Sequence, residues 1–121
     1  MYKGDRSFIL FLNDIIEALE KIETYIKDMS YEEFIKDDKT KDAVLRNLEV
    51  IGEAAKNLSI IVKEKYPAVK WKAIMGMRDK IIHEYFGVSF SIVWETIQND
   101  LPPFKYEVKR ILNDLEKDAI Q

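Results

Sequence analysis

The sequence contains no cysteine and only one histidine, His83, among its 121 residues. The absence of cysteine excludes disulfide scaffolds, thiolate zinc sites, iron–sulfur clusters and cysteine nucleophiles. A single histidine excludes any site that needs two histidines from one chain. The longest apolar run, Phe8 to Leu12, is too short to span a bilayer or to serve as a signal sequence. From these absences we expect a soluble, cytoplasmic protein with no metal site, no cofactor and no membrane partner.

Proline and glycine are also scarce, with three and four residues respectively. So few turn-forming residues give no support to a many-turned β-sandwich, and 47% hydrophobic with 34% charged residues suits a well-packed helical protein. The net charge of −3 argues against a protein that coats duplex DNA. The length fits one domain, so we expect residues 1–121 to form a single helical domain.

Apolar residues recur at alternating steps of four and three, the period of an amphipathic helix, over nearly the whole chain. The first stripe runs from Phe8 to Ile26, and Ser7 or Asp5 would cap its helix. The pattern predicts further helices over residues 30–36 (opened by a capping box), 37–62, 69–84, and from Ser89 or Ser91 to the C-terminus, with a break or kink at 101–103.

Gly52 stands in the middle of the predicted helix over residues 37–62. Glycine costs roughly 1 kcal/mol of helix stability relative to alanine, so we expect a neighbouring helix to approach closely at this position. No stretch alternates at period two for long enough to predict a strand. The predicted fold class is therefore all-α, an antiparallel bundle of four to five helices, three or four of them long.

The segment RDKIIHEYFG, residues 78–87, holds the densest set of reactive side chains. His83 can move protons near neutral pH, and Arg78 carries a permanent charge on a fork that matches phosphate oxygens. Asp79 precedes His83 by four residues, which places the two on one helix face, where the carboxylate would favour the imidazolium. Arg78 and His83 are five residues apart, about 140° around a regular helix. Together these side chains suit metal-free RNA cleavage, in which one group activates the 2′-hydroxyl and another stabilises charge on phosphorus.

The surroundings of this segment are basic, because residues 63–80 hold six basic and two acidic side chains, while the rest of the chain carries −7. A local positive field suits a phosphate-bearing partner such as RNA. Transesterification profits from both a base and an acid, whereas one chain has a single histidine. Catalysis therefore favours a homodimer in which two copies of the segment meet across a two-fold axis.

Simpler interpretations stay open for each of these features. The lysines suit a solvated helix face, and Asp79–His83, together with Arg78–Glu84 or Arg78–Asp79, suits ordinary surface pairs. The aromatic residues near the motif suit either a dimer seam or a hydrophobic core. They are Trp71, Tyr85, Phe86, Phe90 and Trp94.

The chain resembles the HEPN superfamily, and within it the HepT-like toxins that are paired with a minimal nucleotidyltransferase antitoxin. Four segments in order carry the resemblance over nearly the whole chain: LNDIIEALEKIETYI, LRNLEVIGEAAKNL, WKAIMGMRDKIIHEYFGV and VWETIQNDLPPF. The family motif R-x-x-x-x-H-x-Y falls on Arg78, His83 and Tyr85. Many HEPN proteins have asparagine after the arginine, where this chain has Asp79.

The resemblance implies a dimeric, metal-independent endoribonuclease, the toxin of a type VII toxin–antitoxin system. Arg78 and His83 would be the catalytic pair, with Asp79 in support. The cognate nucleotidyltransferase would neutralise the toxin by transferring AMP to Tyr85, where a bulky anion would occupy the place of RNA phosphate. The alternative is a non-catalytic helical module that binds a nucleotidyltransferase or a nucleotide and cleaves nothing.

Overall fold

The computed structural model describes residues 3–58, 60–83 and 87–120, and every regular element in these ranges is helical. The all-α prediction is therefore confirmed. In chain order the elements are α1 (Lys3–Ile26), α2 (Tyr31–Lys36), α3 (Asp38–Asn57), α4 (Ile60–Lys65), α5 (Trp71–His83), α6 (Phe90–Glu95), the π-helix η2 (Thr96–Asp100) and α7 (Leu101–Ile120).

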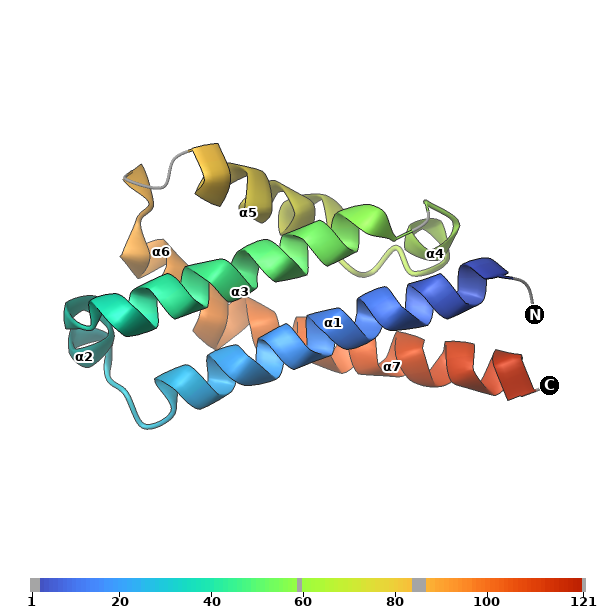
Figure 1. The fold of residues 1–121 in the computed structure, drawn as a ribbon, viewed down its shortest axis with the longest axis horizontal. Coiled ribbons are helices and arrows are strands. Elements are labelled where there is room, and N and C mark those ends of the chain that lie inside the picture. The colour runs from blue at the N-terminus through green and yellow to red at the C-terminus, as the bar shows by residue number, and fades with distance from the viewer. Residues whose placement is uncertain (1–2, 59, 84–86, 121) are drawn as a thin grey trace.

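The four long helices lie side by side in the order α5, α3, α1, α7, each antiparallel to its neighbour (Figure 1). The short helices α2 and α6 lie at one end of this bundle, and α4 lies at the other end. The predicted antiparallel bundle is confirmed. The arrangement leaves α5 as an outer helix, whose main packing partner is α3.

The hydrophobic core consists of the apolar stripes that the sequence predicts. On α1 the stripe Leu12, Ile15, Leu19 and Ile22 is buried, and the stripes of α3 and α7 face it. Burial of each large aliphatic side chain contributes about 1.5–3 kcal/mol, so this shared core is the main stabilising term of the fold. The fully buried side chains at its centre are Phe34, Leu12, Ile15, Leu19, Ile22, Leu45, Leu48, Ile51, Ile111, Val44 and Val108.

Side-chain caps begin α2, α3 and α6. Ser30 and Glu33 form the predicted capping box, with Glu33 N donating to Ser30 Oγ at 3.1 Å and Ser30 N donating to Glu33 Oε1 at 2.9 Å. Asp37 Oδ1 accepts from Thr40 N at 3.0 Å, and this hydrogen bond lowers the pKa of Asp37. The bond from Ser30 N likewise lowers the pKa of Glu33. Ser89 caps α6, which settles the choice between Ser89 and Ser91.

Two predicted helix boundaries are wrong. The first helix begins at Lys3, so Asp5 and Ser7 lie inside α1 and not before its first residue. The helix predicted over residues 37–62 ends at Asn57, because Leu58 is extended with φ −69° and ψ 143°. Leu58 and Val62 are nevertheless both buried, so the four-residue apolar spacing continues across the break. Periodicity alone therefore could not separate α3 from α4.

The chain does not continue as a regular α-helix between α6 and α7. Residues 96–100 form the π-helix η2, and α7 begins at Leu101. Pro102 and Pro103 then lie in the first turn of α7, where a helix needs no backbone N–H donor. The irregularity predicted at 101–103 is present, but it lies in the turn before the prolines.

Candidate active site

Helix α5 carries Arg78, Asp79 and His83, the candidate residues that fall within the described part of the chain. The helix is regular from Trp71 to His83, so Arg78 and His83 lie about 140° apart around its axis and about 7.5 Å apart along it. Within one chain the two side chains therefore leave the helix on different sides. Tyr85, the predicted modification site, lies outside the described residues.

Arg78 is held between two carboxylates. Its Nε lies 2.8 Å from Glu53 Oε2 on α3, and its Nη1 donates to Asp79 Oδ1 at 2.9 Å. The Arg78 side chain is 26% exposed, so part of it reaches solvent. An accessible guanidinium at a helix interface can bind phosphate oxygens, provided that phosphate competes with these carboxylates.

Gly52 on α3 lies directly against Arg78. A Cβ atom at this glycine would collide with Arg78 Cβ and would lie 3.2 Å from Arg78 Cα and N. The close helix approach predicted from this glycine is confirmed, and the approaching residue is Arg78. Gly76, two residues before Arg78 on α5, has open space where a Cβ atom would stand.

A polar groove of about 370 Å³ lies beside Arg78 and crosses three helices. Its charged lining consists of two arginines and three carboxylates, so the groove is not a simple basic channel. Phe11 and Asp14 come from α1, Arg78 from α5, and α3 supplies Arg46, Glu49, Val50, Glu53, Ala54 and Asn57.

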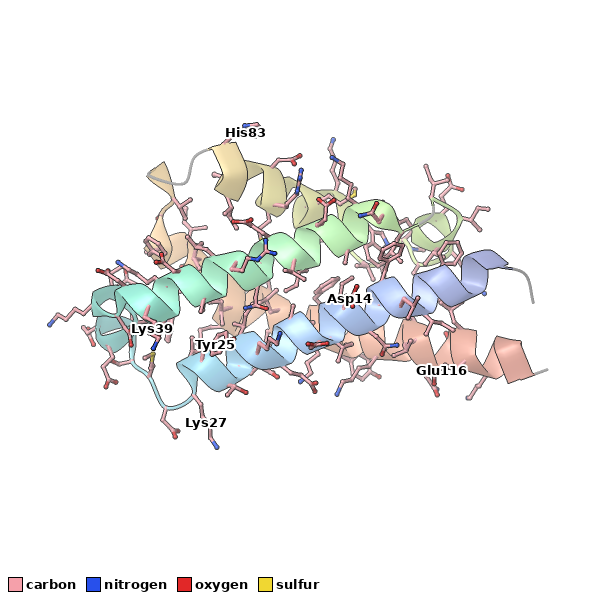
Figure 2. All side chains as sticks on the ribbon, viewed as in Figure 1. Asp14, Tyr25, Lys27, Lys39, His83 and Glu116 are labelled. Atoms are coloured by element: carbon pink, nitrogen blue, oxygen red, sulfur yellow. The ribbon has the colours of Figure 1, made fainter. Side chains whose placement is uncertain are left out.

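His83 is exposed in the last turn of α5. Figure 2 shows its side chain directed away from the bundle. Asp79, predicted to face His83, instead pairs with Arg78 in the part of the chain that the structure describes. This pairing is the alternative that the sequence left open.

The basic character of residues 63–80 is mostly a surface property. Lys65, Lys70, Lys72 and Lys80 are exposed. Lys63 is partly buried, with Nζ 3.2 Å from Met75 Sδ, and burial lowers the pKa of this lysine. None of these exposed lysines lines the groove beside Arg78, whereas Lys63 belongs to the packing between α4 and α5.

The described aromatic residues near the motif belong to the core. Trp71 is buried against Phe104, and its Nε1 donates to Tyr66 O at 3.1 Å. At the other end of α5, Phe90 and Trp94 pack on Phe34. The core interpretation is confirmed for these three aromatics, while Tyr85 and Phe86 lie outside the described residues.

A second groove, of about 600 Å³ and mainly apolar, separates α5 from η2 and α7. Arg78 does not line it, so the polar groove is the one that belongs to the candidate site. In residues 3–58, 60–83 and 87–120 no three His, Asp or Glu side chains are placed to hold a metal ion together. No helix among these residues is long and apolar enough to cross a membrane.

Sequence reasoning missed Glu53. The residue is four positions after Glu49 on the same helix, and both look like ordinary surface carboxylates in the sequence. The one indication was its place directly after Gly52, where a helix was expected to approach. A charged residue beside such a glycine is well placed to reach the approaching helix.

Comparison with known proteins identifies the relatives of this chain. The family model described as "Ribonuclease HepT-like" matches residues 15–111. A protein of Methanocaldococcus jannaschii named as a candidate RNase is 47% identical over 112 residues, which cover 93% of this chain and 97% of the relative. A Thermococcus cleftensis protein named "Probable ribonuclease HepT" is 42% identical over 106 residues, 88% of this chain and 96% of the relative. No solved structure gives a significant match.

The matched region contains all four long helices in part or whole, together with Arg78, Asp79, His83 and the residues that line the polar groove except Phe11 and Asp14. The match thus covers the candidate site as well as the bundle that positions it. The chain belongs to the HepT-like ribonuclease family.

Proposed function

We propose that this protein is a metal-independent endoribonuclease, the toxin of a type VII toxin–antitoxin system. The observation that carries the proposal is the joint exposure of Arg78 and His83 on the outer helix α5 of a HepT-like ribonuclease fold. Both side chains reach solvent, and neither belongs to the hydrophobic core. Because other residues fill that core, the guanidinium of Arg78 and the imidazole of His83 can contact a substrate.

The proposed reaction is an internal transesterification of RNA. A neutral imidazole of His83 accepts the proton of the 2′-hydroxyl, and the 2′-oxygen attacks phosphorus. The bond from phosphorus to the 5′-oxygen breaks, and that oxygen takes a proton from a protonated imidazole or from water. The guanidinium of Arg78 stabilises the negative charge that builds up on the phosphoryl oxygens. The products are a 2′,3′-cyclic phosphate and a free 5′-hydroxyl.

We further propose that the active form is a homodimer. A regular helix separates Arg78 and His83 by about 140°, which is unfavourable for joint contact with one phosphate from a single chain. Two copies of α5 that meet across a two-fold axis would supply two guanidinium groups and two imidazoles to one cleft. The arginine of one protomer and the histidine of its partner can then act on the same phosphodiester.

The proposed partner is a minimal nucleotidyltransferase antitoxin that transfers AMP from ATP to Tyr85. Tyr85 is two residues from His83 in the sequence. An adenylate there would add bulk and negative charge next to the cleft, and both would oppose RNA binding. After incubation with this partner and ATP, the protein should gain the mass of one or more AMP units. A Tyr85→Phe variant that gains the same mass would remove Tyr85 as the target.

A second candidate function is a non-catalytic module that binds a nucleotidyltransferase or a nucleotide. The ion pairs of Arg78 favour it, because two carboxylates already balance the guanidinium charge. Complex formation that survives substitution of both Arg78 and His83, together with no RNA cleavage at high protein concentration, would support this candidate.

The decisive test is RNA cleavage in the presence of a chelator. Parent protein should cut single-stranded RNA or tRNA, and His83→Ala should lower the rate by about 10²–10⁴-fold. His83 is exposed, so the variant should keep its helical circular-dichroism spectrum. Cleavage by His83→Ala at the parent rate would exclude the proposed mechanism.

A further inference from the structure

The orientation of the Arg78 guanidinium depends on contacts from two different helices. Asp79 Oδ1 accepts from Nη1 at 2.9 Å, and Glu53 Oε2 lies 2.8 Å from Nε. A guanidinium is planar and presents its donors in a fixed fork, so two anchored nitrogens define the orientation of the whole plane. Contacts between described residues involve Nε and Nη1 and leave Nη2 for a ligand.

The two carboxylates differ in what they fix. Asp79 is the next residue on α5 and moves with Arg78 whenever that helix moves. Glu53 belongs to α3, in the centre of the bundle, so among the contacts of the described residues it is the one that ties the guanidinium to another helix. A catalytic arginine on an outer helix needs such a contact, because helix motion would otherwise displace its charge from the phosphate.

Gly52 explains why Glu53 can reach Arg78. The absence of a side chain at Gly52 lets the backbone of α5 approach α3 at Arg78 itself. The next residue along α3 therefore stands at the edge of this contact, within reach of the arginine. Glu49, one turn earlier on α3, lines the same groove. Its ion pair is with Arg46 of the same helix, with Oε2 3.7 Å from Arg46 Nη1.

From this geometry we infer that Glu53 is a positioning residue for Arg78, an inference that rests on the proposed ribonuclease function. Glu53 Oε2 forms an ion pair with the guanidinium, 2.8 Å from Nε, and holds it against α3, so that Nη2 faces a phosphate. Its carboxylate also opposes the incoming phosphate by charge. Glu53→Gln keeps a polar side chain of the same length and removes the charge, whereas Glu53→Ala removes both.

The kinetic test compares substitutions at Glu53 with the same substitutions at Glu17, an exposed glutamate of α1 that pairs with Lys21 and does not line the polar groove. Glu53→Ala should lower kcat for RNA cleavage by about 10–100-fold, the cost of misplacing a reacting group. Glu53→Gln should keep kcat within about threefold of the parent and lower KM, because the repelling charge is gone while a polar side chain of the same length remains. Glu17→Ala and Glu17→Gln remove a charge from outside the groove and should leave kcat within about twofold.

A further substitution at Glu53 separates the effect of its charge from the effect of its side-chain length. Glu53→Asp keeps the carboxylate but shortens the side chain by one methylene, so its kcat should fall toward that of Glu53→Ala. The Glu53 side chain is 51% exposed, so these variants should remain folded. A Glu53→Ala variant with the same kcat as Glu17→Ala, or a Glu53→Gln variant as slow as Glu53→Ala, would overturn the inference.

A readout that needs no activity distinguishes this inference from the proposed function. In nitrogen-15 NMR spectra, the Nε resonance of Arg78 should keep its parent position in Glu17→Gln and move in Glu53→Ala, because only the second variant removes the carboxylate that lies 2.8 Å from Nε. If the parent cleaves no RNA, the proposed function fails while this measurement still decides whether Glu53 holds Arg78. An Nε resonance at the same position in the parent and in Glu53→Ala would show that it does not.

Discussion

Two helix interfaces of this protein each hold a cation between two carboxylates, and they differ in what surrounds it. At the α1–α7 interface, Lys105 Nζ lies 2.6 Å from Glu23 Oε1 and 3.7 Å from Glu20 Oε2. At the α3–α5 interface, Arg78 lies between Glu53 and Asp79. Lys105 covers a seam between two core helices, whereas Arg78 lines a groove on an outer helix.

Ion pairs of similar composition therefore have different roles at these two interfaces. Glu23 raises the pKa of Lys105 through a hydrogen bond and its charge, so this lysine keeps its proton and contributes modestly to stability. Arg78 needs no such help, since a guanidinium is charged at every ordinary pH. Its carboxylates determine where the charge is directed, and the open groove beside it allows a ligand to reach it.

The largest expected effect is on RNA cleavage, which substitution of Arg78 should lower and substitution of Lys105 should not. Arg78→Ala should lower RNA cleavage by about 100-fold or more, the usual loss when a group that stabilises transition-state charge is removed. Lys105→Ala should leave cleavage within about twofold of the parent, because Lys105 pairs with carboxylates of α1 and does not line the polar groove. Rates with a defined RNA in chelator measure both. Equal losses in the two variants would show that Arg78 acts only through the fold.

The next effect tests how closely α5 packs on α3. Gly52→Ala should destabilise the protein by about 1–3 kcal/mol, because the new methyl group collides with Arg78 and overpacks the α3–α5 interface. Gly76→Ala is the matched control, with open space around the new methyl group, and should be neutral or stabilising by up to about 1 kcal/mol. Urea denaturation measures both changes. A Gly52→Ala variant as stable as Gly76→Ala would contradict the close approach.

A smaller effect is expected at the α1–α7 interface. Lys105→Met should lower the free energy of unfolding by less than about 1 kcal/mol, because both glutamates are half exposed and water screens the pair. The folded-state pKa of Lys105 is raised above the ordinary 10.5. Its stabilising contribution is therefore fully present below pH 10.5 and lost as the pH rises through the folded pKa.

Parallel melting curves at about pH 8 and about pH 11, on either side of the ordinary lysine pKa, would measure this dependence. The gap in Tm between parent and Lys105→Met should narrow at the higher pH. A gap that stays constant would mean that the lysine stabilises α7 by packing of its methylene groups and not by its charge.

The smallest effect touches neither interface. The pKa values of Asp37 and Glu33 are lowered by the hydrogen bonds that cap α3 and α2. Both groups therefore stabilise the fold above their ordinary pKa values, and this contribution is lost as the pH falls through the lower folded values. Asp37→Asn and Glu33→Gln should lower Tm slightly at about pH 7 and leave it almost unchanged at about pH 2–3. A Tm difference that persists at low pH would show that the carboxylate charge is not what stabilises these caps.

Local patterns in the sequence predicted most of the helices. The capping box at Ser30 depends on residues three positions apart, so it could be found without the fold, whereas the choice of Ser89 over Ser91 needed the structure. The break after Asn57 could not be found, because the buried spacing of Leu58 and Val62 is the same with or without it. The start of α1 was missed because Asp5 and Ser7 are residue types that often precede a helix, whereas α1 already begins at Lys3.

The candidate site divides in the same way. The motif from Arg78 to His83 was visible as residue types and spacing, and the resemblance gave it a role. For Asp79, the sequence left open a pairing with His83 or with Arg78, and only the structure distinguishes the two. Glu53 was not predicted, because it is close to Arg78 only after α5 packs on α3.

The order of residues by itself determined an all-helical chain, where most helices begin, and which helix carries the arginine and histidine, since all of these follow from hydrogen bonds and apolar spacing within a few residues. Three features depend on tertiary packing: α5 lies on the outside of the bundle, Gly52 packs directly against Arg78, and Glu53 reaches the Arg78 guanidinium. Contacts between separate helices depend on how their surfaces interlock, and this packing is a property of the whole core rather than of any short segment.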